Sequence, residues 1–183
     1  MNRKRSASKG KKINPHFWVF CEGVTEAAYV CFLRSKYRIP VDIVTKISGS
    51  NISEGDIRKY KQGKPTHKKD KDFLIYDSDV KDTLNRLKSI RAVTLIASSP
   101  SIELWFLLHY KAQTAHISTN ECIKELSKRN RITYKKGILD ERLTTRLAGH
   151  YSEACKRARN LTLYENPSSN MYLIIKVMEE AKK

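Results

Sequence analysis

Four short apolar runs, separated by segments with helical periodicity, constrain the fold of this 183-residue chain more than any other feature. The runs, which end in polar or turn-forming residues, cover 17–21, 41–47, 73–77 and 92–98. Their bodies are almost continuously apolar, as is typical of strands buried on both faces of a parallel sheet. Helical patterns at 25–37 and 80–89, and a shorter one near 53–61, lie between them. The alternation predicts an α/β fold with a parallel sheet of about four strands flanked by helices.

The second half of the chain predicts helices only. A helix begins after residue 98, with Ser99 as its N-cap and Pro100 in its first turn. Further helices are predicted at 119–129, 140–161 and 168–182, the last one entered through the turn sequence NPSSN. We therefore expect a helical C-terminal extension over 99–183, packed on an α/β core over 15–98.

Length and composition favour a single globular domain. A hydrophobic fraction of 40% over 183 residues is enough to form a substantial core. The basic segment 1–14 is expected to be a disordered arm. No apolar run approaches the roughly 20 residues that a membrane-spanning helix needs, and no secretory segment follows the basic N-terminus. The sequence thus predicts a cytoplasmic protein that does not bind membranes.

Positive charge dominates the composition. Thirty-six Lys and Arg face 19 Asp and Glu, which gives a formal net charge of +17. The basic residues gather at 3–12, 58–71 and 128–136, and such clusters favour a nucleic acid as partner. Tyrosines 60, 134 and 151 lie in or near basic stretches and could stack on bases, or could be ordinary surface or core residues. The predicted nucleic-acid contacts are Lys61, Lys64, Lys68, Lys69, Lys71, Arg129, Arg131, Lys135 and Lys136.

Acidic side chains follow three of the four predicted strands. Glu22 ends the first strand and Glu26 comes one helical turn later. Asp77 and Asp79 follow the third strand, and Glu103 lies in the first turn after the fourth. Because the carboxyl ends of parallel strands meet at one edge of the sheet, we expect these five carboxylates to gather there.

Crowded carboxylates repel one another unless a positive charge lies among them. Carboxylate oxygens suit hard divalent cations, so we expect Glu22, Glu26, Asp77 and Asp79 to bind Mg²⁺ or Mn²⁺. These four residues, together with Glu103, are the predicted catalytic groups. A metal-loaded acidic pocket in a basic surround is suited to phosphodiester hydrolysis, which makes a nuclease the leading hypothesis.

Simpler interpretations of the same residues remain. Glu26 could complement a helix dipole, and Asp77 and Asp79 could cap the helix that begins near Val80. Glu103 could likewise serve its own helix. The chain would then be a non-catalytic nucleic-acid-binding protein of the same fold.

Two further enzyme classes fit less well. A haloacid-dehalogenase phosphatase would need Thr or Val where this chain has Lys81. A sugar-nucleotide transferase would leave both the Glu22-Gly23 pair and the charge of +17 unexplained.

The order of the motifs resembles that of a known family. FCEGVTE followed by LIYDSD is similar to the Toprim domain of primases, topoisomerases and OLD-type nucleases, with Glu22, Asp77 and Asp79 at the matching positions. The Glu-Gly-x-Thr-Glu form, which includes Glu26, is similar to the OLD-like branch. The sequences ASSPSIELWFLLHY and NPSSNMYLIIKVMEE resemble the RloB family more narrowly, and the likeness extends from about residue 15 to the end.

This resemblance implies both a fold and an activity. It implies a Toprim-like sheet in which Glu22 acts as general acid/base or metal ligand and the aspartates hold Mg²⁺. It further implies a nuclease effector of bacterial anti-phage or abortive-infection defence, acting on DNA or RNA, tRNA among them, often beside an ATPase partner. One departure is the segment 49–72, which is short and rich in lysine for a complete helical crossover. We expect this segment to be a loop with one short helix that contacts the substrate.

Overall fold

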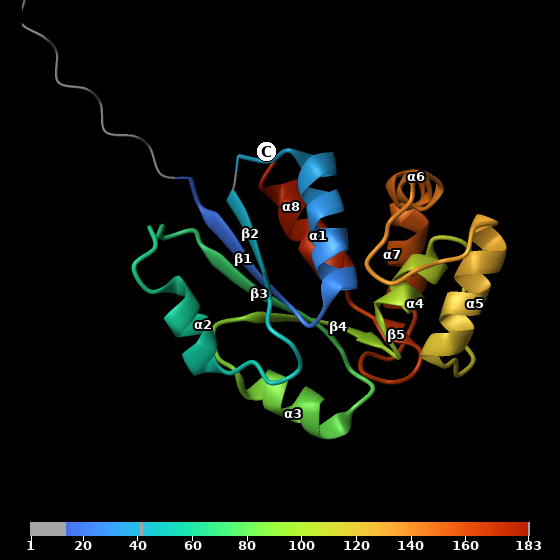
Figure 1. Ribbon diagram of the computed structural model, residues 1–183, viewed down its shortest axis with the longest axis horizontal. Helices are drawn as coiled ribbons and strands as arrows, with labels where there is room; N and C mark the ends of the chain where they lie inside the picture. Colours follow the sequence, from blue (N-terminus) through green and yellow to red (C-terminus); the bar gives the residue numbers. More distant parts are fainter. Residues whose placement is uncertain (1–13, 41, 183) are drawn as a thin grey trace, which may run out of the picture.

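A five-stranded sheet organises the chain, as seen in the computed structural model of Figure 1. The structure describes residues 14–40 and 42–182. The predicted N-terminal arm, except for its last residue, therefore lies outside the described residues. Within the described ranges no helix is both long enough and apolar enough to cross a membrane.

The strand order is β2-β1-β3-β4-β5, and the first four strands are parallel. This arrangement confirms the predicted α/β class and is consistent with a Toprim-like fold. Strand β4 starts later than predicted because Ala92 has a positive φ of 59°, which interrupts extended backbone. The strands are β1 (His16–Cys21), β2 (Asp42–Ile47), β3 (Lys71–Asp77), β4 (Thr94–Ser99) and β5 (Ser168–Ser169).

Eight helices are present in the part of the chain that the structure describes. They are α1 (Val24–Tyr37), α2 (Glu54–Lys61), α3 (Lys81–Ser89), α4 (Ile102–Leu108), α5 (Thr119–Asn130), α6 (Glu141–Gly149), α7 (Tyr151–Arg159) and α8 (Tyr172–Glu180). The short helix predicted near 53–61 is confirmed as α2, which provides the crossover between β2 and β3. Ser53 caps it by accepting a hydrogen bond from the Asp56 amide, and Asp56 accepts one from the Ser53 amide in return.

The strands β1, β3 and β4 are buried on both faces over most of their length, as their continuous apolar sequences predict, whereas the edge strand β2 has only one buried residue. Successive residues of a strand point to opposite faces, so Phe17 and Val19 pack under α1 and α8, while Trp18 and Phe20 pack against α2. Helix α3 covers the same face as α2 through Leu87. This two-sided burial leaves the ends of the strands as the places where polar groups of the sheet reach solvent.

Helix α4 is the centre of the helical part, and all seven of its residues are buried. Its last carbonyl groups are satisfied by arginines of two later helices. Arg157 donates to the Leu108 carbonyl at 2.6 Å, and Arg146 donates through Nε to the His109 carbonyl at 2.9 Å. The arginines thereby replace the intrahelical partners that these terminal carbonyls lack.

Two of the predicted helices differ from the structure. The helix predicted over 140–161 is interrupted at His150, whose φ of −121° and ψ of 21° are non-helical, so two helices form. The predicted helix over 168–182 starts only at Tyr172, since Ser168 and Ser169 form β5 against β4. The first break follows Gly149, and the helices on either side of it each bond the end of α4 through an arginine, while the second difference reflects the pairing of β5 with β4.

Two asparagines fasten the chain around β5. The side chain of Asn170 accepts from the Ala97 amide at 2.6 Å and donates to the Leu95 carbonyl at 3.0 Å. It thus pairs with the edge of β4 where β5 is too short to do so. Asn166 bonds both backbone groups of Ile117 in the same manner.

We expect Asn170→Ala to lower the free energy of unfolding by about 1–3 kcal/mol, because it leaves backbone groups of β4 without partners. Urea denaturation followed by circular dichroism would measure this loss. Asn120→Ala, at an exposed site on α5, is the matched control and should change stability by less than about 0.5 kcal/mol. Equal stability of the two variants would show that the Asn170 amide does not stabilise the sheet edge.

Candidate active site

Two predicted acidic residues meet at the carboxyl edge of the sheet. Strands β1 and β3 are parallel neighbours, and the register pairs Cys21 with Ile75. Glu22 then continues the ladder, since its amide donates to the Ile75 carbonyl at 3.0 Å. Its side chain turns toward β3, where Oε2 accepts a hydrogen bond of 3.0 Å from the Asp77 amide. The pairing of the two central strands thus brings Glu22 to Asp77.

Asp77 also connects the sheet to the helical part. Its Oδ1 accepts a hydrogen bond of 3.0 Å from the amide of Ile102, the first residue of α4. The helix that Asp77 caps is therefore α4, and the alternative in which it caps the helix near Val80 is wrong. Glu22 and Asp77 are half-buried, and one oxygen of each accepts no hydrogen bond from any other described residue.

Glu26 and Glu103 are more deeply buried than the first pair, and both accept hydrogen bonds within the protein. Glu26 accepts from the Gly23 amide at 2.9 Å and so closes the first turn of α1. Glu103 accepts from the Ser101 hydroxyl at 2.6 Å and from the Tyr134 hydroxyl at 3.1 Å. The capping role foreseen for Glu26 is thus present, although its burial exceeds what a surface cap requires.

Burial and mutual repulsion act on these carboxyl groups. Burial, reinforced by the charges of Glu26, Glu22 and Glu103, raises the pKa of Asp77 from 3.8 to about 9. Burial also raises the pKa of Glu26, and the charges of Glu103 and Glu22 act in the same direction. The carboxyl groups at this edge are therefore too crowded and too buried for all of them to be ionised at neutral pH.

Asp79 differs from this coupled group both in its exposure to solvent and in the residues that surround it. It is exposed, forms no side-chain cap on α3, and does not contribute to the pKa shift of Asp77. It lines a hollow of about 550 Å³ together with Lys81, Lys88 and His116. The charges of Glu22, Glu26 and Glu103 thus act on Asp77, whereas Asp79, which follows the same strand, is exposed and stands outside this coupled group.

The site fits a hydrated hard cation better than a cation enclosed by protein ligands. Across 14–40 and 42–182, no group of three or more His, Cys, Asp or Glu side chains is arranged to hold a metal ion. Mg²⁺, however, commonly binds one or two carboxylates and completes its shell with water and substrate phosphate oxygens. Glu22 and Asp77, each with an uncommitted oxygen, match that mode.

A basic loop passes beside the acidic residues. The Gly137 amide donates to the Thr25 hydroxyl at 3.0 Å, which fixes the loop after α5 against the start of α1. Gly137 has a φ of 79°, and a Cβ here would lie 2.9 Å from Val24 Cγ2, so the close approach requires glycine. The exposed Lys135 and Lys136 immediately precede it, and this contact brings them to the acidic edge.

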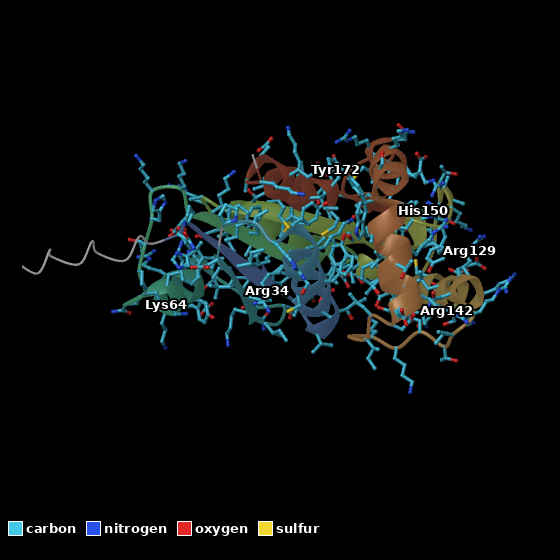
Figure 2. The ribbon with its side chains drawn as sticks, turned by 90° about the horizontal axis from the view of Figure 1, so that it is seen from above. Arg34, Lys64, Arg129, Arg142, His150 and Tyr172 are labelled. Atoms are coloured by element: carbon cyan, nitrogen blue, oxygen red, sulfur yellow. The ribbon has the colours of Figure 1, made fainter. Side chains whose placement is uncertain are left out.

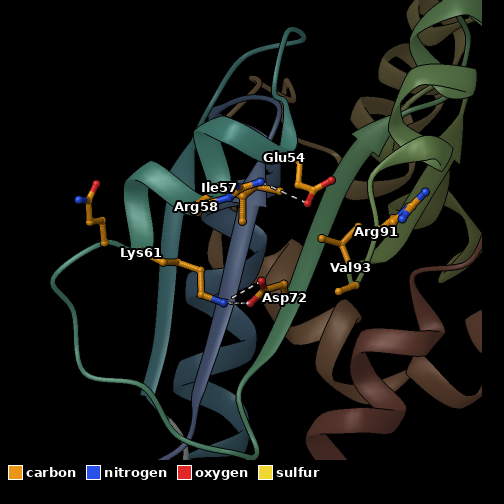
Figure 3. Close-up of a pocket in the computed structure, with 9 residues that line it drawn as sticks. Glu54, Ile57, Arg58, Lys61, Asp72, Arg91 and Val93 are labelled. Carbon is orange, nitrogen blue, oxygen red and sulfur yellow. Dashed lines mark hydrogen bonds and ion pairs between the residues drawn. The ribbon is translucent and has the colours of Figure 1, made fainter.

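The other predicted lysines lie at the opposite end of the sheet. Lys68 and Lys69 precede the start of β3, which is about 20 Å from its carboxyl end at 3.3 Å per residue. Lys61 points across a hollow of about 560 Å³ to Asp72, with an ion pair of 2.7 Å (Figure 3). Lys64 lies over the Tyr60 ring at 3.1 Å. The lysines of the segment that we expected to contact the substrate are thus remote from the acidic edge, whereas the start of the segment lies near it, since the Gly49 carbonyl accepts from the hydroxyl of Tyr76, the neighbour of Asp77.

Two more predicted contacts, Arg129 and Arg131, lie at the end of α5. Arg129 forms an ion pair of 3.3 Å with Glu125, and Arg131 follows the helix in a left-handed conformation with a φ of 56°. Lys71, the last of the predicted contacts, is exposed at the first position of β3.

Sequence reasoning missed the residues that support the site from a distance. Tyr134 is buried with its hydroxyl on Glu103, so it is unavailable for base stacking. Burial and the Glu103 charge raise its pKa, which keeps the donated proton on the phenol. Thr25 and Gly137 are 112 residues apart, and no local pattern signals their contact.

The raised pKa of Asp77 predicts a specific dependence of stability on pH. Between pH 3.8 and about 9 the folded state retains a proton that the unfolded chain releases, so this group lowers the free energy of unfolding as pH rises. Asp77→Asn should remove that dependence and, in chelator at pH 8, stabilise the protein by roughly 1–2 kcal/mol.

Denaturant unfolding at pH 5 and pH 8 would measure the change, with the exposed Asp82→Asn as control. A parallel pH dependence in wild type and Asp77→Asn would contradict the assigned coupling.

Comparison with known proteins identifies the family. A profile of RloB-like proteins matches residues 17–178, which is most of the chain and includes both strand ends of the site. No curated protein and no solved structure matches the chain. The chain belongs to the RloB-like family.

Proposed function

We propose that this protein is a Toprim-type, Mg²⁺- or Mn²⁺-dependent nuclease that hydrolyses phosphodiester bonds of DNA or RNA. The observation that supports this most directly is the pairing of Glu22 with Asp77 at the carboxyl edge, among coupled carboxyl groups. Such an edge favours a cation, and a strongly basic protein favours a polyanionic substrate.

Each residue of the site has a proposed role. Glu22 and Asp77 would hold the cation through their uncommitted oxygens, and Glu22 is also the proposed general acid/base. When bound, the metal supplies Lewis-acid stabilisation of the phosphoryl oxygens and a nucleophilic water. The buried Glu26 and Glu103 add negative charge on the interior side of the site, and Tyr134 orients Glu103 through a hydrogen bond. Lys135 and Lys136 would position the substrate backbone.

Cleavage of labelled single-stranded and duplex substrates in Mn²⁺ or Mg²⁺ tests the proposal. We expect Glu22→Gln and Asp77→Asn each to lower the cleavage rate by at least a hundredfold, because each removes one of the two metal-binding carboxylates. Binding of the substrate in chelator should change less than threefold.

Glu153→Gln, at an exposed site on α7, is the matched control and should cleave at the wild-type rate. Wild-type cleavage by either site variant would contradict the assignment of the site.

A non-catalytic nucleic-acid-binding protein is the second candidate, and one observation favours it. All four coupled carboxylates accept hydrogen bonds within the protein, as purely structural residues would. Isothermal titration with Mn²⁺ separates the two hypotheses. The nuclease hypothesis requires Mn²⁺ binding that is lost in Asp77→Asn and strengthens from pH 6 to pH 8, since metal must displace the proton that Asp77 retains.

The position of the two lysine groups yields a further prediction. Lys135→Gln/Lys136→Gln should weaken substrate binding about tenfold, which corresponds to two exposed ion pairs of about 0.7 kcal/mol each. Lys68→Gln/Lys69→Gln removes the same charge at the amino end of the sheet and should have a smaller effect. Fluorescence polarisation in chelator measures both, and a larger effect of the second variant would place the substrate at the other end of the sheet.

The family resemblance suggests a biological setting for this activity. We propose that the protein is an effector of bacterial anti-phage or abortive-infection defence, that it acts in the cytoplasm, and that an ATPase is its partner. Loss of phage protection in cells that carry Glu22→Gln would support this role.

A further inference from the structure

A hollow lined by arginines lies in the helical part, away from the sheet. It has a volume of about 430 Å³ and is formed by Tyr110, two residues after α4, by the end of α5 and by one face of α6. None of the described residues that line it carries a carboxylate. Arg129, Arg142 and His150 lie at the same end of the molecule in Figure 2. The side chains that matter here are Tyr110, Arg129, Arg131, Arg142, Arg146 and His150, which we call the arginine pocket.

One helix face places like charges next to each other. Arg142 and Arg146 are four residues apart on α6, with Thr145 and Gly149 on the same face. Two cations at this spacing destabilise a helix by a few tenths of a kcal/mol. Arg129 and Arg131 line the same hollow, so four arginine side chains share it.

The floor of the pocket is rigid. The Arg146 guanidinium lies 4.8 Å from the centroid of the Tyr110 ring and donates to the His109 carbonyl and to His150 Nε2, each at 2.9 Å. Because arginine can only donate, the His150 ring must carry its proton on Nδ1. A ligand would therefore meet a guanidinium that is already oriented.

The rim, in contrast, retains donors that the described part of the protein does not use. Arg131 and Arg142 are exposed and form no ion pair with any other described residue. Arg129 shares Glu125 with Lys111, at 3.3 Å and 3.8 Å. Asp140, which precedes α6, accepts from the Asn130 side chain and from the Leu143 amide and forms no ion pair with any of the described rim arginines.

We propose that the arginine pocket binds a phosphate group of a nucleic-acid strand, upstream or downstream of the bond at the acidic edge. Several guanidinium groups without a carboxylate suit phosphate, since their planar forks match its oxygens. The segment from Arg131 to Gly137 joins the pocket to the start of α1 and can extend over at most about 20 Å. A strand anchored in the pocket can therefore reach Glu22 and Asp77. The inference rests on the proposed function only in naming nucleic acid as the source of the phosphate.

Binding of a labelled single-stranded oligonucleotide in chelator, over a range of salt, tests the inference without requiring cleavage. Arg131→Gln/Arg142→Gln should reduce the slope of log K against log salt by about 1.4, the value for two phosphate contacts on a single strand. Arg34→Gln/Arg91→Gln removes the same charge from exposed sites elsewhere and should retain the wild-type slope. Equal loss of slope in both variants would overturn the inference, because net charge alone would then explain it.

Two further measurements complete the test. Arg131→Lys/Arg142→Lys retains the charge but loses the planar fork, so it should keep the slope and bind the oligonucleotide several-fold more weakly. Calorimetric titration with inorganic phosphate and with AMP tests whether the phosphate group that binds the pocket belongs to a small ligand instead of a nucleic-acid strand. AMP binding that the glutamine variant loses, without any change in oligonucleotide binding, would support the phosphate site and overturn the strand as its source. Wild-type behaviour of the glutamine variant toward all three ligands would refute the site.

Because these titrations contain no catalytic metal, their outcome is separate from that of the nuclease assay. A protein that never cleaves can still show the arginine-dependent slope, and a nuclease can lack it. Thermal unfolding of each variant should equal or slightly exceed that of wild type, since Arg131 and Arg142 are exposed and make no ion pair in the described chain, and loss of the Arg142 charge removes the repulsion from Arg146.

Discussion

The parallel pairing of β1 with β3 is the constraint on which the rest of the molecule depends. Its register sets Glu22 beside Asp77, and the Glu22 side chain then accepts from the Asp77 amide where the backbone ladder ends. The same pairing holds Asp77 in a half-buried place among other acids, which raises its pKa to about 9. The fold thus maintains an electrostatically unfavourable edge, as is common where a protein binds a ligand rather than maximises its own stability.

The helical C-terminal part completes this edge instead of merely covering it. Ile102 donates to Asp77, Tyr134 donates to Glu103, and Gly137 fixes a basic loop against Thr25. The Asn170 side chain meanwhile pairs with the open edge of β4. Because both halves supply parts of the same site, neither is expected to retain it alone.

The positive charge has a distribution that composition could not reveal. One group of lysines flanks the amino end of β3, another follows Tyr134 toward the acidic edge, and arginines surround a pocket on α6. Sequence clustering predicted both the first and the second group as nucleic-acid contacts, and the segment that holds the first as the substrate-contacting loop. They differ because chain direction places the α2–β3 connection at the end of the sheet opposite to the acidic residues.

The sequence by itself determined the strands and the acidic residues that follow them. A continuous apolar body such as FLIYD is stable only when buried on both faces, and Asp77 must then emerge at its carboxyl end. Only the tertiary structure decided that Asp77 caps α4, that Ser168 and Ser169 form a strand, that the helix over 140–161 breaks at His150, and that Arg131 and Arg142 line one pocket. Periodicity records how one segment is buried, whereas these features depend on contacts between segments far apart in the chain, which packing alone selects.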